Sequence, residues 1–412
     1  MSYSANASPA EVLIAGGGMV GLSLALALAQ GGVSVAVADP VPESTVLNEA
    51  FDGRVSALSY AAVRMFKALG IWAHLEAHAQ PILDILVTDA ALDSTPSPFS
   101  MHFDHREIGE PMGAIAENRH IRRALFAAVR ETGNITLISP AAVTTIAMRG
   151  EYMDAQLSNG SSVRAKLVVA ADGRDSPLRE QMNLRTIAWS YPQVGIVVTV
   201  QHEREHNGVA YEHFLPSGPF AILPMIGKRS SLVWTERETL APALLKLPPE
   251  QFAAEVARRF GNHLGAIEVL GPRWSYPLRF HLTRGWIAPR FGLAGDSAHG
   301  IHPIAGQGLN LGLKDAAALA ECVLDMVRLG LDAGNAEGLR QYERWRRFDS
   351  FALAAATDGL NRLFSNDITP LRVLRDLGLG IVDAVRPLRR FFMRNAGGDV
   401  GKLPRLMRGE PA

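Results

Sequence analysis

The chain has 412 residues, of which 48% are hydrophobic and 20% are charged, and its 41 basic residues balance 41 acidic ones. These proportions exclude a disordered or fibrous chain, and the lack of a basic excess argues against nucleic-acid binding. The single cysteine, Cys322, excludes an intrachain disulfide, an iron–sulfur cluster and an all-cysteine zinc site. At about 100–200 residues per domain, the length predicts two or three domains, or one large domain with insertions.

The first predicted element is a short buried strand, VLIA, which a glycine-rich turn separates from an apolar helix, LSLALALAQ. The turn reads GxGxxG over residues 16–21, and a second strand, VSVAVA, leads to Asp39. This context is typical of dinucleotide binding. Gly16 permits the sharp turn, Gly18 lets a pyrophosphate approach the backbone, and Gly21 permits close packing of the helix. Asp39 is placed to accept hydrogen bonds from a ribose, and the fingerprint alone fits FAD or NAD.

Helices and short strands alternate in the next part of the chain. We expect a helix over Ser56–Leu69 with Ser56 as its N-cap, and an amphipathic helix over Arg119–Arg130. The strands predicted here are Pro81–Thr88, Ile135–Ile138, Ala142–Met148, Met153–Leu157 and Leu167–Ala170. A turn at Asn159-Gly160 indicates that part of this set forms a small antiparallel meander.

A strand-rich region from Ile187 to Glu236 predicts a second sheet in the middle of the chain. Helices near Leu240–Leu247 and Pro249–Phe260 follow, and then strands near Arg273–Phe280 and Ile287–Leu293. From Gly308 onward, nearly every segment has a helical pattern. Because no linker is long enough to separate the two sheets, we expect the dinucleotide-binding domain to be discontinuous.

Three further motifs carry chemistry: DGRVSAL at residues 52–58, ADGRDSPLR at 171–179, and GLAGDSAHGIHPIAGQGLNLGLKDA at 292–316. In the third motif a strand ends at Asp296, whose carboxylate can hold the hydroxyl groups of a bound polyol. The free N–H groups of the helix that begins near Leu309 favour negative charge. His299 and His302 form an HxxH pattern that fits either a metal site or a ligand contact in a turn. Because no carboxylate stands at helical ligand spacing, we expect no metal.

The three motifs resemble, in content and order, those of the flavin-dependent aromatic hydroxylases of the para-hydroxybenzoate hydroxylase fold. The segments HPIAGQGLNLGLKDAAALAE, EHFLPSGPFAILPM and FMRNAGGDVGKLPRLMRG are similar to the branch that hydroxylates polyprenylated phenols in ubiquinone biosynthesis. The resemblance runs from about Glu11 to Gly409. It implies noncovalent FAD as the cofactor and NAD(P)H as a transient reductant.

The fold class that we predict is α/β, with a discontinuous Rossmann-like FAD-binding domain, an interleaved antiparallel-sheet substrate domain and a helical C-terminal region. The FAD-binding domain is expected to comprise residues 1–80, 106–185 and 284–330. The substrate domain is expected to comprise residues 81–105 and 186–283, and the helical region residues 331–412.

The resemblance also implies a role for individual residues. The FAD pyrophosphate is expected at Gly16, Gly18 and Gly21, the adenosine ribose at Asp39, and the ribityl chain near Asn118 and Asp296. Arg54 is expected to contact FAD near the pyrophosphate or ribityl chain, and Asp172 to support the FAD site and the transient nicotinamide. The remaining expected contacts are with the isoalloxazine ring, and they are Gly308, Leu309 and Asn310. For Asp172, a loop-capping role remains an alternative.

The implied reaction is hydroxylation of an electron-rich ring by O2 through a flavin C4a-hydroperoxide. No Ser-His-Asp or paired-carboxylate constellation is present, so no catalytic residue is assigned. The expected substrate-contacting residues lie on the second sheet and in the flavin turn, and they are Phe214, Phe220, Leu223, His302 and Pro303. Because the sheet residues include no Lys or Arg, we expect a hydrophobic phenolic substrate rather than a small benzoate. Core packing remains an alternative for each apolar member.

The segment from Asp383 to Ala412 has seven Arg/Lys and three Asp/Glu residues around Phe391, Phe392 and Met393. It is either a surface helix with a tail or a contact with an anionic membrane or a biosynthetic complex. No signal peptide is expected, so the predicted location is cytoplasmic, with peripheral membrane association as an option. Hydroxylation of another lipophilic or aromatic substrate, and a silent FAD-binding scaffold, remain alternative functions. An NAD-dependent dehydrogenase would have no use for Asp296 or the Gly308–Asn310 segment.

Overall fold

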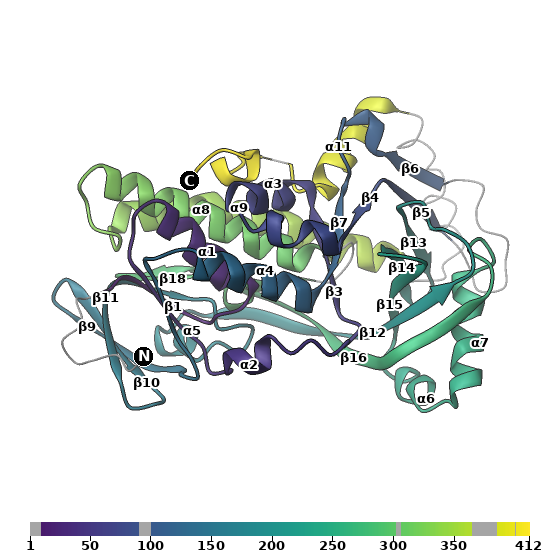
Figure 1. Ribbon diagram of the computed structural model, residues 1–412, viewed down its shortest axis with the longest axis horizontal. Coiled ribbons are helices and arrows are strands. Elements are labelled where there is room, and N and C mark those ends of the chain that lie inside the picture. The colour runs from purple at the N-terminus through teal and green to yellow at the C-terminus, as the bar shows by residue number, and fades with distance from the viewer. Residues whose placement is uncertain (1–9, 90–99, 302–305, 365–384, 400) are drawn as a thin grey trace.

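The computed structural model describes residues 10–89, 100–301, 306–364, 385–399 and 401–412. Figure 1 shows two parts side by side, one in which helices cover a sheet and one dominated by a second, strongly twisted sheet. A small three-stranded sheet joins them. The α/β class with interleaved sheets is therefore confirmed.

The first sheet, sheet A, has the Rossmann-like arrangement expected from the glycine-rich turn. Its strands run in the order β17-β18-β11-β1-β2-β8, and β10 and β9 extend it beside β11. The pairs β18–β11, β11–β1, β1–β2 and β2–β8 are parallel, whereas β9, β10 and β11 form the antiparallel meander and β17 is antiparallel to β18. The strands are β1 (Ala10–Ala15), β2 (Val35–Ala38), β8 (Ile135–Ile138), β9 (Val143–Arg149), β10 (Tyr152–Leu157), β11 (Ser162–Ala170), β17 (Ile287–Ala288) and β18 (Phe291–Leu293).

Helices bury one face of sheet A (Figure 1). α1 is almost wholly buried because it packs between β1 and α8, and Gly312 of α8 meets Val20 of α1 so closely that a Cβ at Gly312 would lie 2.7 Å from that side chain. The helices in and around this part are α1 (Met19–Gln30), α2 (Glu43–Val46), α3 (Tyr60–Ala68), α4 (Asn118–Arg130), α5 (Pro177–Gln181), α8 (Gln307–Arg328) and α9 (Ala336–Phe364).

The predicted helix over Ser56–Leu69 is wrong in its first part. Residues Val55–Ser59 form strand β3, which pairs with β7 (Gly113–Glu117), and β7 also pairs with β4 (Ala79–Ile82). This three-stranded sheet is sheet B. The N-cap of α3 is Ser59, whose Oγ accepts a hydrogen bond from the Ala62 N–H at 3.3 Å. Pairing with β7 satisfies backbone groups that a helix would otherwise satisfy locally, so a tertiary contact overrides the local pattern.

The second large sheet, sheet C, is built from segments far apart in the chain. Its order is β19-β16-β12-β15-β14-β13-β5-β6, and β5 pairs in parallel with β13. The strands are β5 (Asp84–Asp89), β6 (Ser100–Asp104), β12 (Thr186–His202), β13 (Val209–Leu215), β14 (Gly218–Met225), β15 (Arg229–Arg237), β16 (Ile267–Thr283) and β19 (His299–Gly300). α6 (Ala241–Leu245) and α7 (Pro249–Phe260) follow β15, and their apolar side chains cover one face of the sheet, the outer face.

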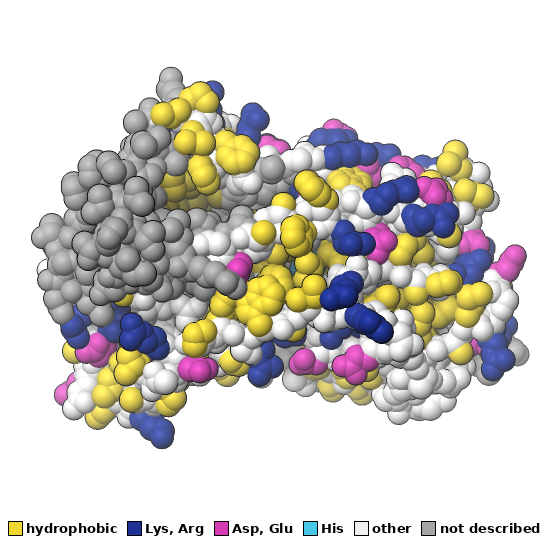
Figure 2. All heavy atoms as spheres, turned by 180° about the vertical axis from the view of Figure 1, so that it is seen from behind, with side chains coloured by type: hydrophobic (Ala, Val, Ile, Leu, Met, Phe, Trp, Pro, Cys, Tyr) yellow, Lys and Arg dark blue, Asp and Glu magenta, His cyan; other side chains and the backbone are white. Residues whose placement is uncertain are grey.

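The other face of sheet C, the inner face, looks toward sheet B and α11 (Arg386–Ala396). Figure 2 shows the molecule from behind, where hydrophobic side chains gather in the middle of the surface beside Lys and Arg side chains. Within the described ranges, no helix combines the length and apolarity needed to cross a bilayer.

Candidate functional site

The glycine-rich turn shows which glycines the fold itself requires. Gly16 has φ +109°, and a Cβ there would lie 2.2 Å from the Ala171 carbonyl oxygen. A Cβ at Gly21 would lie 2.0 Å from the Gly16 carbonyl oxygen, so a side chain at either position is excluded by backbone. Gly18 differs, because it has an ordinary φ of −74° and a Cβ there would meet nothing within 4 Å. The open space in front of Gly18, at the N-terminus of α1, has room for an anion such as a pyrophosphate, whose binding there stays a prediction.

Asp39 lies at the end of β2, next to this turn. Its Oδ2 accepts a hydrogen bond from the Gly17 N–H at 2.6 Å, and its Oδ1 accepts one from the Val41 N–H at 2.8 Å. The carboxylate therefore has a fixed orientation beside the glycines. Each oxygen retains a second lone pair that can accept a ribose hydroxyl.

The structure brings Arg54 and Asn118 together at the start of β3. The Asn118 N–H donates to the Arg54 carbonyl at 2.9 Å, and the Asn118 Oδ1 accepts from the Ser56 hydroxyl at 2.7 Å. The Arg54 guanidinium pairs with Asp52 at 2.7 Å and lies over the Trp274 ring, and its side chain is half exposed. Although burial raises the pKa of the Asp52 carboxyl, hydrogen bonds from Arg54 outweigh this effect and lower that pKa overall.

The second and third motifs meet at the end of sheet A. The Arg179 guanidinium, through Nη1, donates to the carbonyls of Arg174 at 2.8 Å and Ser297 at 3.0 Å, and so ties the two loops together. Both carboxylate oxygens of Asp172 are buried, and burial raises the pKa of this group although Ser176 and the Leu178 backbone lie close enough to lower it in part. These neighbours are also the ones that a loop cap would use. The ligand-binding role of Asp172 stays a prediction, with the loop cap as its alternative.

Asp296 lies in the short turn Gly295–Ser297, where its side chain is exposed and its carbonyl accepts from His281 Nε2 at 2.7 Å. Sequence reasoning missed the buried charges that hold this turn. Asp315 Oδ2 accepts from the Gly295 N–H at 3.1 Å and contacts His299 Nε2 at 2.5 Å, and Asp315 Oδ1 pairs with Arg346 at 2.9 Å.

The Asp315 and Arg346 side chains are wholly buried. Burial alone would raise the pKa of Asp315, but the charges of His299 and Arg346 outweigh it and lower that pKa. Asp315 therefore stays ionised and fixes the backbone that presents Asp296. The signal in the sequence for this buried charge was Asp315 itself, which interrupts the largely apolar helical run LGLKDAAALAE.

At the start of α8, Gly308 and Leu309 are partly exposed, whereas Asn310 is buried. The Asn310 amide bonds to the protein itself: Oδ1 accepts from the Ser59 N–H, and Nδ2 donates to the Ala57 carbonyl, each at 2.9 Å. Asn310 thus fixes α8 against β3. Any contact of this residue with a flavin ring would come from its backbone.

The predicted substrate-contacting residues separate onto two faces of sheet C. Leu223 packs on the inner face with Ala57 of β3, and Phe214 packs on the same face with Val87 of β5. Phe220 is fully buried on the outer face, where its ring meets Trp234, and Trp234 in turn meets Phe252 of α7. We therefore remove Phe220 from the expected lining, because alternate side chains of a strand point to opposite faces. His302 and Pro303 lie outside the described residues.

A further acidic side chain on the inner face escaped the sequence analysis. Glu212 lies on β13 between Ala210 and Phe214, opposite Ala221 of β14 and Val87 of β5. The Glu212 side chain is partly buried, its carboxyl makes no hydrogen bond or ion pair with the described residues, and burial raises its pKa to about 7. The buried Asp89 lies two residues further along β5, opposite Phe214. The inner face thus combines apolar side chains such as Leu223 and Phe214 with two acidic ones, Glu212 and Asp89.

Comparison with known proteins shows which family and which relatives the chain resembles. A profile of the FAD-binding domain matches residues 9–354. Over 406 residues the chain is 49% identical to ubiquinone hydroxylase UbiL of Rhodospirillum rubrum, covering 98% of this chain and 93% of that protein. Over 397 residues it is 33% identical to 3-demethoxyubiquinol 3-hydroxylase of Escherichia coli, covering 95% and 99% of the two chains.

Among solved structures, p-nitrophenol 4-monooxygenase PnpA from Pseudomonas putida matches with a TM-score of 0.77 and 18% identity, covering 96% of this chain and 99% of that one. At this level of identity the likeness shows the fold alone.

Proposed function

The chain belongs to the ubiquinone-biosynthesis branch of the FAD-dependent hydroxylases, and from that premise we propose that it hydroxylates the ring of a polyprenylated phenol. It is an FAD-dependent monooxygenase, for which NAD(P)H is the typical reductant. The observation that carries the substrate class is the apolar pair Leu223 and Phe214, which β14 and β13 place on the inner face of sheet C. Neither β13 nor β14 has a Lys or Arg residue, so these strands offer no cation to pair with a benzoate carboxylate.

The chain's own residues would bind, orient and shield the reactants. Bound FAD supplies the oxygen-activating chemistry once it is reduced. The N–H groups at the start of α1 would hold the pyrophosphate, and Asp296 would hold a ribityl hydroxyl. The N-terminal N–H groups of α8 would stabilise negative charge that develops nearby. Leu223 and Phe214 would orient the phenol and exclude water.

The test of this proposal compares a series of phenols that differ only in tail length. Each methylene buried on the inner face contributes about 0.8 kcal/mol, so kcat/KM should rise with the first isoprene units until the available space is filled. Product must be measured by mass, and hydrogen peroxide must be measured in parallel to correct for uncoupled turnover. Efficient hydroxylation of para-hydroxybenzoate, with no gain from a tail, would reject the ubiquinone-pathway substrate and favour a small aromatic one. Absence of both NAD(P)H oxidation and hydroxylated product with every phenol would favour a silent FAD-binding protein.

A contact of the C-terminal region with a membrane or a biosynthetic complex is the second part of the proposal. α11 exposes Phe391 and Phe392 beside the half-exposed Arg390, and Phe348 and Phe351 of α9 are also exposed. Cationic and aromatic side chains on one helix suit an anionic lipid surface. Co-sedimentation with anionic and neutral vesicles, using the chain and its Phe391→Ser variant, measures this. Equal recovery in the supernatant with both lipids would reject the membrane contact.

A further inference from the structure

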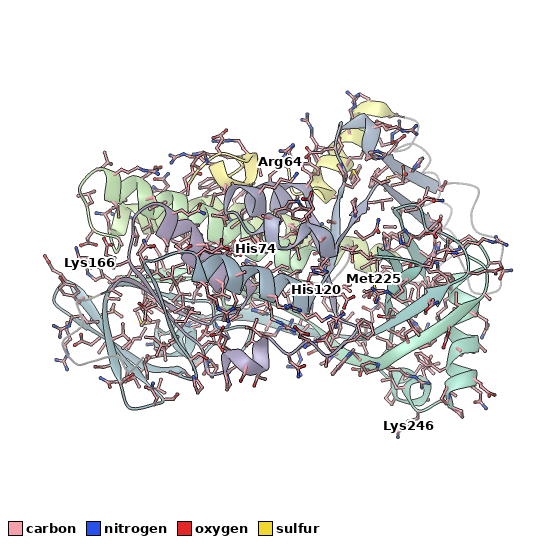
Figure 3. The ribbon with its side chains drawn as sticks, in the orientation of Figure 1. Arg64, His74, His120, Lys166, Met225 and Lys246 are labelled. Atoms are coloured by element: carbon pink, nitrogen blue, oxygen red, sulfur yellow. The ribbon has the colours of Figure 1, made fainter. Side chains whose placement is uncertain are left out.

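A pocket of about 150 Å³ lies away from the glycine-rich turn, where sheet B meets sheet C. Three segments line it: the end of the turn before β4, the β7–α4 junction, and the turn between β14 and β15. Figure 3 shows His120 of α4 and Met225 of β14 close together at this junction. The pocket is lined by Ala77, His78, Ile115, Glu117, Arg119, His120, Met225, Ile226 and Arg229.

The polar side of the pocket has more positive charge than negative charge. Arg119 and Arg229 both pair with the single carboxylate of Glu117, at 2.8 and 3.3 Å. The Nε of Arg229 donates to the Ile226 carbonyl and its Nη2 to Glu117, and the guanidinium lies over the Phe51 ring. Its Nη1 makes no hydrogen bond or ion pair with the described residues. The His78 and His120 rings stack at 4.1 Å, and burial lowers the pKa of His120. An anion is therefore the ligand that this arrangement suits best.

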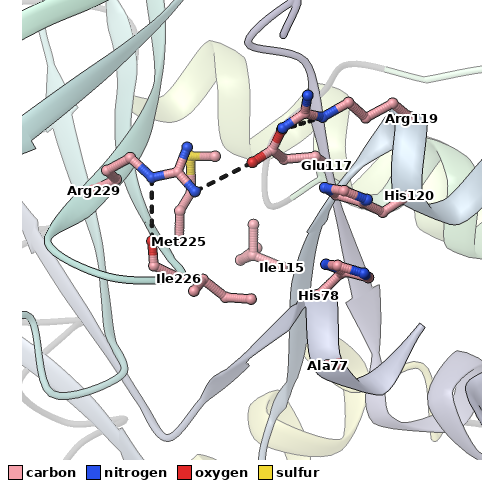
Figure 4. Close-up of a pocket in the computed structure, with 9 residues that line it drawn as sticks. All are labelled: Ala77, His78, Ile115, Glu117, Arg119, His120, Met225, Ile226 and Arg229. Carbon is pink, nitrogen blue, oxygen red and sulfur yellow. Dashed lines mark hydrogen bonds and ion pairs between the residues drawn. The ribbon is translucent and has the colours of Figure 1, made fainter. Parts of the chain in front are cut away.

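The opposite side of the pocket is apolar. Figure 4 shows Ile115 between the stacked histidines and the Met225–Ile226 side, with the two arginines above it. An apolar floor below cationic groups suits a flat ring attached to a phosphate. The volume of about 150 Å³ is smaller than that of ordinary small-molecule sites, so the pocket holds only part of such a ligand and the rest would extend over the surrounding surface.

The position of the pocket links it to the flavin motif. Ile115 lies directly across from Ala57 in sheet B, and a Cβ at Gly306, before α8, would be 3.2 Å from the Ala57 side chain. One strand thus separates the pocket from the segment expected to face the flavin ring. A dinucleotide bound by one half in the pocket could extend its other half toward that segment.

We propose that this pocket binds one phosphorylated nucleotide unit of the NAD(P)H reductant, with phosphate on Arg229 and Arg119 and a ring on the Ile115–Met225–Ile226 floor. The inference rests on the proposed function, because only a monooxygenase that is reduced by NAD(P)H needs such a site. The site is distinct from the FAD pyrophosphate site at Gly18.

The test is anaerobic reduction of the FAD-loaded enzyme by NADH and by NADPH, without any phenol, followed by flavin absorbance in a stopped-flow instrument. The concentration dependence separates the apparent Kd for the nucleotide from the limiting rate of reduction. Arg229→Gln should raise this Kd at least about tenfold while the limiting rate stays within about twofold. Calorimetric titration with NADP+ and with inorganic pyrophosphate should show the same loss of binding without turnover.

The control is Lys228→Gln, which removes a neighbouring half-exposed cation outside the pocket lining and should leave the Kd unchanged. Ile226→Glu introduces a carboxylate at a position that is 40% exposed, so it should fold normally and weaken nucleotide binding by repulsion. If Arg229→Gln is unstable, the nucleotide Kd of Ile226→Glu tests the site by itself. An unchanged Kd in Ile226→Glu, and in a folded Arg229→Gln, overturns the site. Failure of the parent enzyme to be reduced by either nucleotide would instead overturn the proposed function.

Discussion

Alanine at Gly18 should separate the binding role of the glycine-rich turn from its structural role. In the structure a Cβ at Gly18 has no neighbour within 4 Å, and the φ of −74° is ordinary for alanine. The only cost to the FAD-free protein is a poorer N-cap for α1, about 1 kcal/mol or less. If a pyrophosphate lies over Gly18, the added methyl group displaces it. A misfit of about 1–3 kcal/mol then weakens FAD binding about 5–150-fold.

Gly21→Ala is the matched comparison, because its Cβ would lie 2.0 Å from the Gly16 carbonyl oxygen and 3.3 Å from the Ile14 side chain. Backbone on one side and a buried strand on the other leave no room for relaxation. We expect the FAD-free variant to lose 3 kcal/mol or more, roughly, of unfolding free energy.

Urea unfolding of the FAD-free proteins and fluorescence titration with FAD measure the two quantities separately. Equal destabilisation by the two alanines would show that the space at Gly18 is filled by protein. Unchanged FAD affinity in Gly18→Ala would show that the pyrophosphate binds elsewhere.

Three further variants test the surrounding charges. Asp296→Ala should weaken FAD binding about 10–150-fold in a fluorescence titration with little change in unfolding free energy, because it removes only charge-assisted bonds to ligand hydroxyls. Binding of FAD as tight as in the parent would contradict our placement of this motif. Glu212 has a folded pKa of about 7, above its ordinary value of 4.5, so the folded state holds the proton more strongly and stability is lost as pH rises through 7. Between pH 5 and pH 8 the parent should therefore lose up to about 3 kcal/mol of unfolding free energy that Glu212→Gln does not lose, as denaturant titrations at the two pH values would show. An identical pH dependence in parent and variant would refute this. Arg346→Met should cost about 3–5 kcal/mol because the wholly buried Asp315 loses its arginine, and a loss below about 1 kcal/mol in urea unfolding would show that His299 suffices.

The glycine-rich turn could be predicted from the sequence because its determinants are local. A buried strand, a turn that requires Gly16 at φ +109° and a following helix all lie within about 25 residues, and the second strand brings Asp39 next to them. The position of Asp296 shortly after the apolar strand β18 could be predicted for the same reason, whereas its binding role stays a prediction.

The errors come from contacts between distant segments. Ser56 reads as an N-cap, but pairing of β3 with β7 moves the cap to Ser59. Phe220 reads as pocket lining, but the face on which a strand residue lies depends on the register with its neighbours, and here α7 covers it. The pairing of Asp315 with Arg346 joins two helices, so neither residue reveals its partner in the sequence.

The parallel pairing of β5 with β13 has a consequence for synthesis on the ribosome. The first residues of these strands, Asp84 and Val209, pair across 125 positions of the chain. At about 5–20 residues per second, β5 and β6 leave the ribosome roughly 6–25 s before β13 can pair with them. During that interval their hydrophobic face and one hydrogen-bonding edge have no partner from sheet C. A nascent chain stalled before residue 209 should therefore bind a chaperone more strongly than one that has released all of sheet C, a difference that pull-down of stalled ribosome complexes would detect.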